Sequence, residues 1–238
     1  MYTAEKTAIL VDGGFYKHQA RRLFGDKSPQ ERAQELIAYC HRHLKQDNGM
    51  KNSLYRIFYY DCEPLSGNVY HPFLKKDVNF SKTGDYSWNI AFYEELSHQR
   101  KLALRMGELS VGESGFVLRP SVVNHLFRGD RTFESLNEDD FVLDIKQKGV
   151  DMRIGLDIAS LAYKNQVSQI VLIAGDSDFV PAAKHARREG IDFILDPMRQ
   201  GIRESLGIHI DGLKCRTYPL DKTMLDPLHV DYKRIENQ

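Results

Sequence analysis

One stretch, residues 169–181, constrains the fold of this chain more than any other, because an apolar run there ends abruptly in two carboxylates. Residues 170–174 are all apolar, as in a strand that is covered on both faces of a parallel sheet. Gly175 permits a sharp turn, and Asp176 and Asp178 follow at the carboxyl end of the expected strand. Ligands of open α/β sheets bind outside the carboxyl ends of the strands, so a functional site is expected here.

The residues after this turn have the pattern of a helix. Pro181 falls in the first turn, where a missing N–H is harmless, and Gly190 ends the helix. An Asp after a strand is commonly just the N-cap of the next helix, and Ser177 or Asp178 could fill that role. Capping does not need Asp176 as well, so a function for these acids depends on partners elsewhere in the chain.

The rest of the chain alternates expected strands and helices. This alternation predicts an α/β fold with a doubly wound, mainly parallel sheet. We expect one domain over residues 1–219, with an inserted elaboration at about 65–140, and a C-terminal tail over 220–238. The expected strands are 7–11, 54–60, 141–147, 170–174 and 191–195, with an edge strand at 214–218, and the expected helices are 15–24, 29–45, 88–100, 151–163, 181–189 and 202–206.

Composition narrows the functional class. The formal net charge is zero with 28% charged residues, so no global basic field indicates a nucleic-acid partner, although a local basic patch is compatible with it. The three cysteines, Cys40, Cys62 and Cys215, form no Cys-x-x-Cys pair, which argues against a disulfide framework and a zinc knuckle. The N-terminus has no apolar signal core, and no apolar run approaches 18 residues. We therefore expect a soluble, cytoplasmic protein that is not in a membrane.

Further acids stand at the ends of other expected elements. Asp12 follows the strand 7–11, and Gly13 and Gly14 after it would let a ligand approach the backbone and the next helix N-terminus, although an ordinary Asp-Gly turn explains them equally well. Asp61 ends the strand 54–60 in the same way.

Another acid, Asp151, stands at the start of the expected helix 151–163. It could cap that helix or reach a site at the sheet edge. Asp157 lies about 240° further round the same helix, so both acids cannot easily face one site. We assign Asp151 to the site and give Asp157 a supporting or structural role.

Asp12, Asp151, Asp176 and Asp178 would converge if the strands that end at Asp12 and Asp176 are neighbours. Two carboxylates about 5 Å apart repel by roughly 3 kcal/mol at an effective dielectric constant of about 20, so such a cluster demands a cation or protons. Oxygen ligands without clustered Cys or His favour Mg²⁺ or Mn²⁺ over zinc. A metal held there could activate a water toward a phosphodiester, which indicates phosphoryl chemistry.

Residues 64–86 are rich in lysine and aromatic side chains and are expected to form a loop. Lys75, Lys76 and Lys82 interleaved with aromatic rings suit single-stranded nucleic acid, whose bases stack and whose backbone is anionic. A solvated loop that is pinned by a few buried rings explains the same composition.

Three motifs in this chain together resemble the NYN domain family, most closely its LabA/DUF88 branch. They are Ile-Leu-Val-Asp-Gly-Gly-Phe, Lys-Gly-Val-Asp with Leu-Asp-Ile-Ala-Ser-Leu-Ala, and Ala-Gly-Asp-Ser-Asp-Phe-Val-Pro, and the resemblance covers residues 7–15, 148–163 and 170–219. It implies a PIN-like fold and a metal-dependent ribonuclease that uses Mg²⁺ or Mn²⁺. The implied catalytic and metal-binding residues are Asp12, Asp151, Asp176 and Asp178.

The resemblance also bears on substrate contacts. Ser205 and Asp211 match a Ser-x-x-Leu helix and a following acid of the branch, so they are expected to line the pocket. Some NYN nucleases have Asn three residues after the first Asp, where this chain has Phe15. RNA, single-stranded, is the expected partner, and a homodimer is compatible with the sequence. The expected substrate-binding residues are Gly13, Gly14, Lys148, Ser177, Ser205, Lys75 and Lys76.

Two other functions fit parts of the pattern. A catalytically idle module could use the same groove to bind RNA or a protein, although an unused acid cluster would cost stability. A phosphatase of the haloacid dehalogenase type would need Asp-x-Asp after the first strand, and Gly14 occupies the place of the second Asp.

Overall fold

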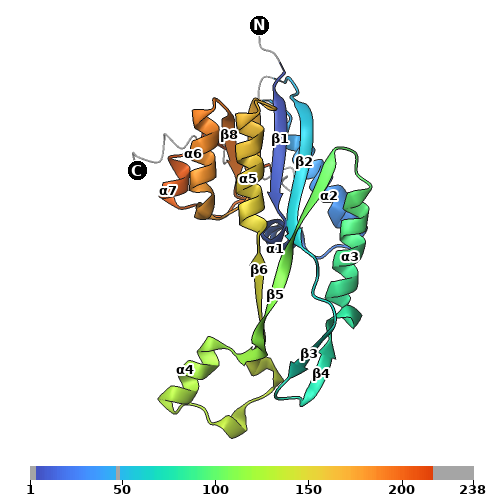
Figure 1. Cartoon of the computed structure of the whole chain (residues 1–238), viewed down its shortest axis with the longest axis vertical. Helices are drawn as coiled ribbons and strands as arrows, with labels where there is room; N and C mark the ends of the chain where they lie inside the picture. Colours follow the sequence, from blue (N-terminus) through green and yellow to red (C-terminus); the bar gives the residue numbers. More distant parts are fainter. Residues whose placement is uncertain (1–3, 47–48, 217–238) are drawn as a thin grey trace, which may run out of the picture. The chain divides into compact units, whose positions relative to one another are not determined.

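The structure is a computed structural model that describes residues 4–46 and 49–216, and it divides into two compact units (Figure 1). The core unit comprises the described residues up to Asp61, Ala91–Gly107, and those from Gly149 onward. The second unit comprises Cys62–Ile90 and Glu108–Lys148. The expected tail over 220–238 lies outside the described residues, and the expectation of one domain with an elaboration stays a prediction.

The core unit is built on parallel strands around β1 (Lys6–Asp12). On one side β1 pairs in parallel with β2 (Ser53–Cys62), and on the other with β7 (Gln169–Ile173). Beyond β7, β8 (Asp192–Asp196) and the short β9 (Gly212–Leu213) continue the parallel set. In order of pairing the strands are β6-β5-β2-β1-β7-β8-β9, which confirms an α/β fold with a mainly parallel sheet and is consistent with a PIN-like architecture.

Helices of the core unit follow the strands. Helix α5 (Val150–Tyr163) packs on β1 and on α6 (Val180–Arg188), so these two helices cover one face of the sheet (Figure 1). The short η4 (Ser177–Phe179) leads into α6. The other helices are α1 (Gly13–Phe24), α2 (Pro29–His43), the C-terminal part of α3 (Gly84–Ser97), and α7 (Glu204–Gly207).

Local signals explain several element boundaries. Ser28 and Glu31 form the capping box of α2, with Pro29 in the first turn, as their sequence predicts. Residues 8–11 of β1 and 170–173 of β7 are almost completely buried, as expected for strands covered on both faces. The edge strand that was expected at 214–218 is not found at residues 214–216, and residues 217 and 218 lie outside the described residues. The edge strand is instead β9, Gly212–Leu213, because these two residues pair with Ile194 and Leu195 of β8.

A buried carboxylate anchors α2 to the end of β8. Asp196 is completely buried, and it accepts hydrogen bonds from the hydroxyl of Tyr39 and the backbone N–H of Met198. Its Oδ2 lies 2.8 Å from Nε2 of His43. Burial raises the pKa of Asp196, but the bonds from His43, Tyr39 and Met198 outweigh burial and hold the pKa below its usual range.

The second unit is antiparallel. A hairpin joins β3 (Asn68–His71) to β4 (Lys76–Asn79), and the end of β5 (Leu102–Leu118) pairs with β6 (Phe141–Lys148). The expected loop at 64–86 is therefore wrong in part, since residues 68–79 form this hairpin and η1 (Phe80–Lys82) follows it. Aromatic rings fill the space beside the hairpin, where His71 lies 4.2 Å from Phe116 between ring centroids.

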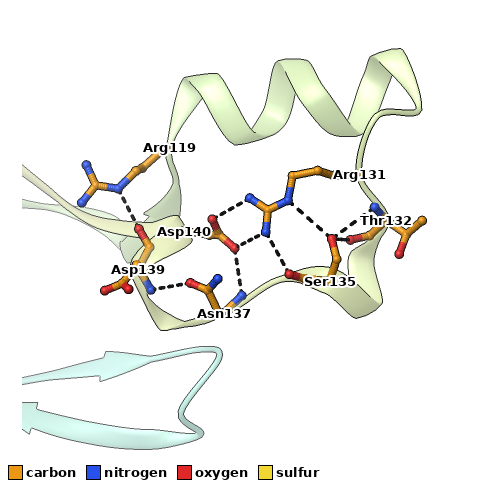
Figure 2. A network of polar contacts seen from close by, with 7 residues as sticks. All are labelled: Arg119, Arg131, Thr132, Ser135, Asn137, Asp139 and Asp140. Atoms are coloured by element: carbon orange, nitrogen blue, oxygen red, sulfur yellow. Dashed lines mark hydrogen bonds and ion pairs between the residues drawn. The ribbon is translucent and has the colours of Figure 1, made fainter.

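Residues 119–140 of the second unit form helix α4 (Pro120–Arg128) and a loop that is held by a polar network (Figure 2). Arg131 donates to both carboxylate oxygens of Asp140, at 2.7 and 2.8 Å. Asp140 also accepts from the backbone N–H of Asn137 at 2.8 Å, and Arg131 donates to the carbonyl of Ser135. These charge-assisted bonds fix the loop between η2 (Phe133–Ser135) and η3 (Glu138–Asp140).

Two composition-based expectations can be compared with the structure. Cys40, Cys62 and Cys215 are buried thiols and are not joined in disulfides. Among the described residues, no helix has both the length and the apolar character that crossing a membrane requires.

Candidate functional site

Asp12 is the last residue of β1 and the N-cap of α1. Its Oδ1 accepts the backbone N–H of Phe15 at 3.1 Å, so one carboxylate oxygen is held by the helix N-terminus. The side chain is largely buried, and burial raises the pKa of Asp12 to about 6 against the opposing effect of the Phe15 N–H. The charges of Asp151 and Asp61 raise it further, which places both acids near Asp12.

Asp151, Asp176 and Asp178 supply the exposed part of the site. Asp151 lies in the first turn of α5, and Asp176 is the N-cap of η4, where its Oδ1 accepts the N–H of Asp178 at 3.0 Å. Partial burial raises the pKa of Asp151, and the charges of Asp176 and Asp178 raise it further. Asp151 therefore interacts electrostatically with Asp12 and with the two acids that follow β7.

Asp61, at the end of β2, was not among the predicted site residues, yet it adjoins Asp12. Its Oδ2 forms an ion pair with Nζ of Lys17 at 2.8 Å and accepts the hydroxyl of Tyr59 at 3.1 Å. Because β2 and β7 flank β1, all three strands deliver an acid to the same edge of the sheet. The strand-end position of Asp61 was the available signal, but its partner Lys17 is recognisable only from the fold.

The glycines next to the acids are explained by close packing. A Cβ on Gly13 would lie 2.6 Å from the ring of Tyr59 and from the carbonyl oxygen of Tyr60, so β2 occupies the space there. A Cβ on Gly175 would lie 2.5 Å from the Phe15 ring. Phe15, which stands where some NYN nucleases have Asn, thus packs against the turn that carries Asp176. Gly14 is half-buried, and its assignment to substrate binding stays a prediction.

Of the three further residues that were expected to line the pocket or bind substrate, Ser177 and Ser205 lie in or beside η4, whereas Asp211 lies elsewhere. Ser177 accepts a hydrogen bond from Arg203 at 3.2 Å, and α7, which carries the exposed Ser205, contacts η4. Asp211 does not line this site. It pairs with Arg187 at 2.8 Å and accepts the N–H of Phe193 at 2.9 Å, near the amino end of β8, because β9 runs parallel to β8 from that end.

Asp157 has the structural role that its position on α5 predicts. Its Oδ2 accepts the hydroxyl of Tyr60 at 2.8 Å and Nε of Arg105 at 3.1 Å. Lys75, Lys76 and Lys148 are exposed and belong to the second unit, the first two in the β3–β4 hairpin and the third at the end of β6.

The oxygen atoms of these carboxylates suit a hard divalent cation such as Mg²⁺. Proteins usually bind Mg²⁺ through one or two carboxylates, and several waters and the substrate phosphate complete its coordination. Within residues 4–46 and 49–216, no three or more His, Cys, Asp or Glu side chains are positioned to hold a metal ion together. Burial raises the pKa values of Asp12 and Asp151, and the charges of neighbouring carboxylates raise them further. The carboxylates therefore have the right donor atoms for such a metal. Among the described residues, however, fewer than three of them are positioned to bind one ion together.

Comparisons with known proteins give a partial family match and a likeness to solved structures. The NYN domain model matches residues 129–201, which supports the NYN family and links the chain to PIN-like nucleases. No curated protein matches the chain. A crystal structure of VPA0982, a protein of unknown function from Vibrio parahaemolyticus RIMD 2210633, is similar over 93% of this chain and 98% of that one, with 13% identity and a TM-score of 0.46. That likeness is too low to inform function.

Proposed function

We propose that this protein is a metal-dependent ribonuclease of the NYN family, in its LabA/DUF88 branch, that hydrolyses RNA phosphodiester bonds. The observation that carries the proposal is the electrostatic coupling of Asp12, Asp151, Asp176 and Asp178 at one edge of a parallel sheet. The NYN match over residues 129–201 includes three of these acids and supports the same reaction class.

Each acid has a role in this proposal. Asp12, oriented by the Phe15 N–H, would offer its second oxygen to a cation, and Asp151, Asp176 and Asp178 would offer exposed carboxylates to the cation or to its bound waters. The bound Mg²⁺ or Mn²⁺ would supply Lewis-acid activation of water and of the phosphoryl group. The proposed substrate contacts are Gly13, Gly14, Lys148, Ser177, Ser205, Lys75 and Lys76, and RNA in single-stranded form is the proposed partner.

The proposal is tested with purified protein and labelled single-stranded RNA, structured RNA, single-stranded DNA and a generic phosphomonoester, each with and without Mg²⁺ or Mn²⁺. We expect metal-dependent cleavage of RNA. Cleavage of the phosphomonoester alone would contradict the proposal.

Asp176→Asn sharpens this test, because Asn keeps the shape of the side chain and its N-cap oxygen but loses the charge. We expect RNA cleavage to be lost, while the divalent ion raises the melting temperature of the wild type and hardly changes that of the variant. Asp26→Asn is the matched control, since Asp26 forms an exposed ion pair with Arg21 and lies away from the acid site in sequence. Wild-type cleavage by Asp176→Asn would exclude this site.

A catalytically idle module that binds RNA or a protein is the second candidate. The observation that favours it is the absence of three grouped metal-binding side chains within the described part of the chain. RNA binding with no cleavage in either metal, together with a melting temperature that the metals do not shift, would favour this function instead.

A further inference from the structure

An open hollow of about 710 Å³ lies at the C-terminal end of α6, in the core unit. Its charged walls come from α6 itself, from the start of β8, and from the segment before β9. Four groups that can carry positive charge line it, Lys184, Arg187, Arg188 and His209, beside two acids, Asp192 and Asp211.

Both acids already have partners. Asp211 binds Arg187 and the N–H of Phe193, and Asp192 accepts Nε2 of Gln169 at 2.7 Å. Among the described residues, the side chains of Lys184 and Arg188 make no hydrogen bond or ion pair. Two exposed cations without partners therefore remain in the hollow once its acids are satisfied.

His209, which also lines the hollow, is affected by the positive charges of the neighbouring side chains. Desolvation lowers the pKa of His209, and the charges of Lys184 and Arg187 lower it further. Cations are also favoured at a helix C-terminus by the helix dipole. The helix dipole accounts for the basic residues on α6. It does not account for His209, which lines the other wall of the hollow and does not belong to α6.

This hollow is separate from the acid site. Asp176 and Asp178 precede α6, whereas Lys184 lies at the middle of α6 and Arg187 and Arg188 lie at its C-terminal end. Along nine helical residues the two ends are about 14 Å apart. Asp192 and Asp211 lie at the amino end of β8, the edge of the sheet opposite to the one that carries Asp12.

We propose that this hollow, with Lys184, Arg187, Arg188 and His209 on its walls, is a phosphate-binding site. Arg and Lys are the side chains that bind phosphate oxygens best, and the hollow has the size of a site for a nucleotide rather than for a bare ion. The phosphate belongs either to an RNA backbone that also reaches the acids or to a free nucleotide. The RNA source rests on the proposed function, whereas phosphate binding itself does not.

The test compares the full chain with Lys184→Met/Arg188→Met and with a control that loses the same two charges elsewhere, Lys51→Met/Arg100→Met. Lys51 and Arg100 are exposed residues of the core unit outside the hollow. Binding of a labelled single-stranded RNA and of adenosine monophosphate is measured over a range of salt concentrations, in chelator so that no cleavage occurs. Circular dichroism verifies that all variants are folded.

If RNA supplies the phosphate, the hollow variant binds RNA more weakly whatever its sequence, and its salt slope falls by about 1.4 for two lost contacts. If a free nucleotide supplies it, adenosine monophosphate binds the wild type and control but not the hollow variant, while RNA binding is unchanged. Equal binding of both ligands by the hollow variant and the control overturns the proposal. Because no cleavage is measured, this outcome is independent of whether the acids are catalytic.

Discussion

At the scale of single residues, Asp12 is held between two opposing effects. Its burial beside Asp151 and Asp61 favours the protonated form, whereas the N–H of Phe15 and the start of α1 favour the carboxylate. Burial is the larger effect, so metal-free protein has a titrating group at a pKa of about 6.

This pKa predicts a pH-dependent stability. Because the pKa is raised from 3.8 to about 6, the folded state binds the proton more tightly, and the resulting stabilisation is present below about pH 4 and lost as the pH rises through 6. Relative to Asp12→Asn, the wild type should lose on the order of 3 kcal/mol of unfolding free energy over this window. Urea unfolding of both proteins in chelator measures it, and a constant difference between pH 4 and pH 7 would contradict the assignment.

Gly175 gives a second prediction at this scale. Gly175→Ala places a methyl group against the Phe15 ring, and such overpacking costs about 1–3 kcal/mol. Gly201→Ala is the control, since a Cβ there meets nothing within 4 Å. Adding Phe15→Ala to Gly175→Ala should recover part of the lost stability, and thermal unfolding of the single and double variants tests this coupling. Additive effects would show that the ring does not limit the turn.

At the scale of secondary-structure elements, the sequence predicts those helices and strands whose positions are determined by local residue patterns. The buried strands β1 and β7, the capping box at Ser28 and the strand-end acids follow from apolar runs and capping residues. Helix α4 also has local signals, Pro120 in its first turn and Gly129 as its left-handed C-cap. The β3–β4 hairpin depends on distant neighbours, such as Val69 against Gly115, and has no comparable local signal. For the same reason the pairing of Asp61 with Lys17 could not be predicted, since those residues are brought together by the folded sheet.

The β3–β4 hairpin carries a prediction of its own about substrate. Replacing Lys75 and Lys76 of the hairpin, together with Lys82 of the adjoining η1, by Ala should weaken RNA binding and flatten its salt dependence, because these exposed cations would no longer neutralise phosphates. Filter binding at several salt concentrations measures the change, with Lys45, Lys51 and Lys164 replaced together as a control of equal charge. Unchanged affinity at low salt would mean that the hairpin is structural.

At the scale of the whole molecule, the division into two compact units predicts that a substitution in one unit affects the stability of that unit alone. Arg131→Met removes both bonds to Asp140, so the backbone of residues 131–140 should lose protection from hydrogen exchange while the core unit keeps its own. Arg128→Met, which removes an exposed cation of the same unit, should leave the protection pattern unchanged. Loss of protection around β1 or β7 in Arg131→Met would show that the units unfold together.

The parallel pairing of β1 with β7 joins residues that are far apart in sequence, with Thr7 opposite Gln169. Bringing the two ends of so long a loop together is slow. Its entropic cost is offset only when the two strands pair. During synthesis, therefore, Asp12 emerges from the ribosome long before its partners at Asp151 and Asp176. A nascent chain has no assembled acid site until β7 and Asp176 have been made, so the order of translation would delay the proposed cleavage of RNA near the ribosome.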